Sequence, residues 1–155
     1  MSDELAPVAV VLTQVAAAQG LAAACAMGKV AVDAVPTPIG AVAVCRDTAD
    51  GEPERVAHVI SRLVAHSHAV LVVQRDGRLT ASRWSAGERG EDLAAGLLLD
   101  GAPPQVEALL LGTATAADLE GTVSSVGMSR WRATRLLASA ARVARGASRP
   151  PAAGS

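Results

Sequence analysis

The chain must build its core almost without aromatic side chains. Its 155 residues contain no Phe and no Tyr, and Trp84 and Trp131 are the only aromatic residues. Half of the residues are hydrophobic, so Ala, Val and Leu have to fill the interior. These side chains bury less area each than an aromatic ring does. We therefore expect modest stability per residue, or a core whose burial is completed by self-association.

Short apolar runs in the first 84 residues alternate between strand-like and helix-like patterns. In chain order they predict a strand at 8–13, a helix at 14–29, strands at 30–35 and 41–46, a helix within 47–67, and strands at 69–74 and 78–84. This order predicts the α+β class and, within it, a ferredoxin-like βαββαβ core with one added edge strand, 78–84. For residues 8–34 a single long helix is the open alternative, because short apolar runs do not separate helix from strand.

The pair Asp76-Gly77 is the strongest turn pattern in the chain. It lies between two extended runs, and Asp-Gly is typical of a two-residue hairpin turn. We expect both residues at the centre of that turn, with Gly77 at positive φ.

After Trp84 the pattern changes to short helical segments. Residues 85–146 are predicted to form four helices, with Thr115 as the N-cap of the third and a basic amphipathic helix at the end. Residues 147–155 are a disordered tail by composition. The chain is therefore expected to have a core domain at 1–84, a helical C-terminal segment at 85–146 and a short tail.

Charge is divided unevenly along the chain, although the net charge is only −1. Residues 1–120 hold all fifteen acidic residues and eight basic ones, whereas residues 121–155 hold six arginines and no acid. Five of these arginines lie on the predicted last helix, and we take them as the candidate binding residues for a protein partner or a nucleic acid. They are Arg130, Arg132, Arg135, Arg142 and Arg145.

Two functions fit this basic helix. Residues 116–137 have the outline of a helix-turn-helix, with a turn near Gly127 and a second helix whose arginines would contact DNA. The alternative is an amphipathic helix that docks on the acidic portion of its own chain or of a neighbour. The second interpretation accounts for the charge division without nucleic acid, and we prefer it. An anionic membrane surface is a third and less favoured partner.

The chain lacks the motifs of common enzymes and metal sites. No nucleophile elbow, phosphate loop, zincin helix or dinucleotide fingerprint is present. His66 and His68 flank the predicted end of a helix, and His58 lies eight residues before His66, so the spacing does not bring a ligand set together. We therefore expect no catalytic residue, no metal and no cofactor.

Cys25 and Cys45 lie in Ala- and Val-rich surroundings, as reduced buried thiols do. The acidic N-terminus does not resemble a secretory signal. The uncharged stretch from Leu5 to Gly28 is long enough to span a bilayer, but its Ala-rich composition and glutamines favour a strand and a helix. These features indicate the cytoplasm of a bacterial type of cell.

Together, these patterns predict a small non-enzymatic cytoplasmic interaction or assembly module that associates with itself or with another protein. The alternative is a DNA-binding transcriptional regulator, with the helix-turn-helix at 116–137 and an N-terminal sensing or dimerisation domain.

Overall fold

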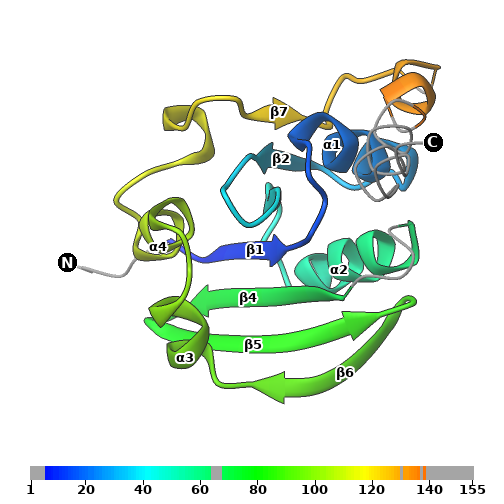
Figure 1. Ribbon diagram of the computed structural model, residues 1–155. Helices are drawn as coiled ribbons and strands as arrows, with labels where there is room; N and C mark the ends of the chain where they lie inside the picture. The colour runs from blue at the N-terminus through cyan, green and yellow to red at the C-terminus, as the bar shows by residue number, and fades with distance from the viewer. Residues whose placement is uncertain (1–5, 64–67, 130, 137, 139–155) are drawn as a thin grey trace, which may run out of the picture.

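The computed structural model describes residues 6–63, 68–129, 131–136 and 138. It has the mixed α+β composition that the sequence predicts (Figure 1). The elements are β1 (Val8–Leu12), α1 (Ala18–Met27), β2 (Val32–Val35), β3 (Val42–Cys45), α2 (Glu52–Leu63), β4 (Ala69–Arg75), β5 (Arg78–Ser85), β6 (Glu88–Leu93), α3 (Ala95–Asp100), α4 (Pro104–Leu111), the 3-10 turn η1 (Ala116–Asp118) and β7 (Val123–Ser124). Residues 8–34 therefore form strand, helix and strand, and the single long helix is wrong.

In the part of the chain that the structure describes, seven strands form one antiparallel sheet in the order β6-β5-β4-β1-β3-β2-β7. The strand β1 lies near its middle and pairs on one side with β3 and on the other with β4. The expectation of a five-stranded sheet is wrong, because β6 and β7 both extend it. Both of these strands come from the part of the chain that follows residue 84.

Helices cover both faces of the sheet. On one face α1 and α2 pack over a cluster that includes Val11, Leu21 and Ile60. On the other face α3 and α4 pack over a second cluster that includes Val10 and Leu110. Figure 1 shows α3 and α4 in front of the sheet and α1 and α2 on its other side. None of the described helices is long and apolar enough to cross a membrane.

The sequence predicts a helix directly after Trp84, but the chain first makes another hairpin. Ala86 and Gly87 have φ of 52° and 84°, the positive values that a two-residue hairpin turn requires. The turn is held by α2: the backbone N–H of Gly87 donates to Oγ of Ser61 (2.9 Å), and Nδ1–H of His58 donates to the Gly87 carbonyl (2.7 Å). β6 therefore becomes the edge strand in place of β5.

The edge strand β6 carries charges that discourage pairing with another sheet. Its residues from Glu88 to Asp92 are all exposed. Arg83 pairs with Glu91 at 2.9 Å, and Arg89 pairs with Asp92 at 2.9 Å. Charged, exposed side chains on an edge strand commonly disfavour its pairing with the edge of another sheet. A contact between copies is therefore better sought elsewhere on the molecule.

The turn between β4 and β5 confirms the prediction from Asp76-Gly77. The two residues have φ of 55° and 75°, and they connect strands paired from Ala69↔Trp84 to Arg75↔Arg78. The backbone N–H of Gly77 donates to Oε1 of Gln74 at 3.2 Å. The turn thus has the backbone conformation that favours Asn, Asp and Gly.

Replacing Gly77 by Val should destabilise the fold by about 1–2 kcal/mol, because an L side chain resists positive φ. No atom lies within 4 Å of the position that its Cβ would take, so the cost comes from the backbone and not from a clash. Gly96→Val is the matched control, because Gly96 also has open space around it but lies in α3 without a positive φ. Equal free energies of unfolding for the two variants in urea would contradict the assignment.

Candidate functional site

The first part of the basic helix lies against the end of α1. Residues 131–136 are helical, and Ser129 caps them, since the backbone N–H of Arg132 donates to Oγ of Ser129 at 3.1 Å. Ala133 is completely buried, and Oγ1 of Thr134 lies 3.6 Å from Sδ of Met27. Figure 1 shows this helix, in orange, beside α1. Its inner side is therefore anchored on the core.

The outer side of this helix presents an aromatic and cationic surface. We call Trp131, Arg132 and Arg135 the basic surface. Trp131 is 70% exposed, and the guanidinium carbon of Arg135 lies 4.7 Å from the centre of its ring, a cation–π contact. Arg132 and Arg135 are exposed, and neither forms an ion pair with another residue that the structure describes. The other three predicted binding residues, Arg130, Arg142 and Arg145, lie outside the described residues.

Of the two helices predicted within 116–137, the described residues form the second, at 131–136, but not the first. The first segment is the single turn η1 followed by β7, which pairs with β2. Thr115 is a cap as predicted, in a capping box with Asp118, but it begins a turn and not a helix. Ser125 then fastens the chain to β2, because its Oγ accepts from the Val32 backbone N–H (2.9 Å) and donates to the Val30 carbonyl (2.8 Å).

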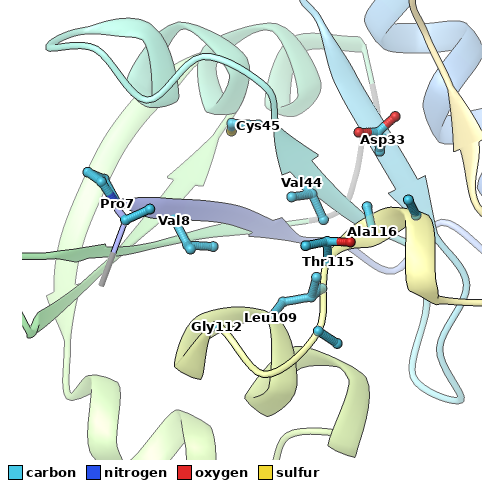
Figure 2. Close-up of a pocket in the computed structure, with 12 residues that line it drawn as sticks. Pro7, Val8, Asp33, Val44, Cys45, Leu109, Gly112, Thr115 and Ala116 are labelled. Carbon is cyan, nitrogen blue, oxygen red and sulfur yellow. The ribbon is translucent and has the colours of Figure 1, made fainter. Parts of the chain in front are cut away.

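A hollow of about 440 Å³ lies between the sheet and the loop that follows α4 (Figure 2). The start of β1, the strands β2 and β3, the end of α4 and η1 all contribute to it. Its walls are mostly apolar and include Pro7, Val8, Val44, Leu109, Ala114 and Ala116. Its volume is within the range of small-molecule sites, roughly 300–1,000 Å³. It is the second candidate site.

The charged group among the lining residues of this hollow is the carboxylate of Asp33, and the hydroxyl of Thr115 also lines it. Both carboxylate oxygens of Asp33 accept from Nε of Arg46, at 3.2 and 3.1 Å, and Nη2 of Arg46 lies 2.7 Å from Oδ1. The same Nη2 donates to Oγ of Ser124 at 3.0 Å. The hydrogen bond to Asp33 raises the pKa of Arg46. The hollow thus contains a carboxylate that is already neutralised by a fixed cation.

Sequence reasoning did not identify this hollow. One sequence pattern that points to it is the acid Asp33 inside the apolar run 30–35. If this run forms a strand, the face that holds Asp33 must be covered by other residues, or its carboxylate must be paired. The loop at the opposite wall is shaped by Asp118, whose carboxylate accepts from the backbone N–H of Thr115 (2.9 Å) and from its hydroxyl (3.0 Å). Both hydrogen bonds lower the pKa of Asp118, and the one from the backbone N–H has the larger effect.

The histidines do not come together in the described part of the chain. His58 donates to the β5–β6 turn, and His68 is exposed just before β4. His66 lies outside the described residues. Among the residues that the structure describes, no group of three His, Cys, Asp or Glu side chains could hold a metal ion.

The comparisons with family models, with curated proteins and with solved structures find no match for this chain. Within the described residues, the basic surface and the hollow are the features from which we infer a function.

Cys25 and Cys45 are buried and unpaired, on the face of the sheet that α1 and α2 cover. Burial raises the pKa of both thiols to about 12. The charge of Cys45 further raises the pKa of Cys25, and the charge of Glu54 further raises the pKa of Cys45. Because the thiolate is the reactive form, neither cysteine is suited to act as a nucleophile in the folded protein.

Both thiols should resist Ellman's reagent until the protein unfolds. An exposed thiol ionises near pH ~8.5, so the folded protein should react slower by about two orders of magnitude than the same chain in guanidinium chloride. The rate is followed by the absorbance of the released thionitrobenzoate, at neutral and at mildly alkaline pH. Labelling of the native protein at the rate of the unfolded chain would show that the thiols are accessible and ionised.

Proposed function

We propose that the protein is a small non-enzymatic interaction and assembly module that associates with copies of itself through the basic surface. The observation that carries this proposal is the exposure of Trp131, at 70%, beside two arginines without a described acidic partner. Trp and Arg are the residues most enriched at the centres of protein interfaces. In a chain with two aromatic residues, placing one of them in solvent leaves much apolar area uncovered.

Complementary residues are found on the layer formed by α3 and α4. Leu97 and Asp100 are three residues apart on α3, and Glu107 and Leu111 are four apart on α4, so each helix presents a leucine and an acid on one side. All four are exposed, Leu97 by 75% and Leu111 by 47%. Neither carboxylate forms an ion pair with a described residue. We call these four residues the acidic surface.

One copy of the chain cannot bring its own two surfaces together. The basic surface lies beside α1, whereas α3 and α4 cover the opposite face of the sheet, at the far corner of the molecule in Figure 1. The partner that fits is therefore a second copy, joined head to tail. Such a contact is heterologous, and it produces rings or open chains instead of a closed dimer.

The proposal extends to the fold type of the core and to the cellular location of the protein. The element order β1-α1-β2-β3-α2-β4 and the strand order β4-β1-β3-β2 support a ferredoxin-like unit inside the larger sheet. The unpaired buried thiols support a cytoplasmic location, since reducing compartments keep cysteines in this form.

Head-to-tail association predicts a specific result for two variants in which side chains of one surface are replaced by Ala. Trp131→Ala with Arg132→Ala removes the basic surface, and Glu107→Ala with Leu111→Ala removes the acidic surface. In sedimentation velocity at low salt, each variant alone should be monomeric at concentrations where the native chain associates. An equimolar mixture should form one-to-one complexes and nothing larger, because each complex has only damaged surfaces left at its two ends.

The matched control is Ile39→Ala with Arg78→Ala, which shortens one exposed apolar side chain and one exposed arginine that belong to neither surface. This control should associate like the native chain. A native chain that stays monomeric at all concentrations, or a mixture that forms no complex, would overturn the head-to-tail contact.

A further inference from the structure

We propose that the hollow between β3 and the loop after α4 binds a small, uncharged and mostly apolar molecule that has one hydrogen-bond donor. This site is separate from the basic and acidic surfaces, since none of their residues lines it. It adds a ligand to a module that is otherwise proposed to bind only protein.

The walls favour an apolar body. Val8 and Val44 project from neighbouring strands, and Leu109 faces them from α4. Alanines and Pro7 form most of the remaining wall, so the space between these elements is not filled by large side chains. Figure 2 shows Pro7, Val8, Val44 and Leu109 around the hollow, with Asp33 at one end. A ligand that covers these groups would gain the usual hydrophobic free energy of burial.

The polar end favours a donor over an anion. The side chain of Asp33 is 19% exposed, and its oxygens accept from Arg46 while keeping capacity for another hydrogen bond. The helix α4 ends at Gly112, which lines the hollow, and the negative end of the helix dipole lies there. A negatively charged ligand would meet a carboxylate and this helix end. Because Arg46 already neutralises Asp33, a positive charge on the ligand is not required either.

Two related fluorescent probes test both parts of this inference. N-phenyl-1-naphthylamine is uncharged and carries one N–H, and 8-anilino-1-naphthalenesulfonate has the same rings with a sulfonate. The uncharged probe should bind at one site per chain with a large increase in emission. The sulfonate probe should bind at least about tenfold more weakly, because an anion is poorly tolerated in apolar, acidic surroundings.

Filling the hollow should remove this binding. Val44→Phe places a ring into the hollow from β3. Ala114→Leu fills it from the opposite wall, which is a loop that can adjust to the larger side chain. The second variant therefore keeps the test possible if the first does not fold. Val126→Phe is the matched control, because Val126 is 52% exposed and does not line the hollow. Emission titrations should show loss of the single site in the filled variants and an unchanged site in the control.

The outcomes separate this site from the proposed self-association. The Trp131→Ala, Arg132→Ala chain should bind the uncharged probe as the native chain does. Probe binding that persists in both filled variants would overturn the assignment, and so would equal affinity for the two probes. Loss of probe binding only in the Trp131→Ala, Arg132→Ala chain would place the probe at the interface between copies.

Discussion

The fold depends on the burial of β1 on both of its faces. Val10 and Val11 are adjacent and completely buried, and they point into different apolar clusters. A strand of this kind requires a layer of helices above and below the sheet. Small side chains let those layers approach closely: a Cβ placed on Gly28 of the α1 terminus would lie 2.2 Å from Cγ1 of Val59 on α2. The near absence of aromatic residues is thus compensated by close helix packing.

The two candidate sites follow from how the second layer is built. The helices α3 and α4 are short, and no residue of α3 is fully buried. After α4 the chain turns at Gly112, which has φ of 76°, and passes over β3 and β2 through η1. This path leaves the hollow beside Asp33, and Leu97 on α3 and Leu111 at the end of α4 stay exposed. A layer that covers the sheet incompletely therefore provides both a cavity and an apolar surface.

The sequence predicts the arrangement from β1 to β5 because its signals there are local. Alternating or continuous apolar runs give β1 to β5, and Asp76-Gly77 gives the turn between β4 and β5. The strand β6 has the sequence Glu-Arg-Gly-Glu-Asp-Leu, whose polar residues and glycine are poor strand formers. It is a strand because the turn at Ala86-Gly87 directs it along β5, and that turn is fixed by Ser61 and His58 on α2.

Local sequence patterns also do not predict β7 or the hollow, because both depend on contacts between distant parts of the chain. β7 has two residues, and the side chain of Ser125 attaches it to residues more than ninety positions earlier in the chain. The hollow needs the relative positions of β3 and the loop after α4, which only the tertiary structure gives. By contrast, the exposed arginines of the basic surface were recognisable from the charge division alone, although their partner was not.

The fluorescence of Trp131 tests most directly whether the basic surface meets another copy of the chain. In a Trp84→Phe background all of the tryptophan emission comes from Trp131. Dilution at low salt should shift this emission to longer wavelength as the copies separate and the ring enters water, and duplex DNA added to the diluted protein should leave it unchanged. An emission that does not change on dilution but responds to DNA, with an affinity that falls steeply with salt, would contradict self-association and indicate nucleic-acid binding.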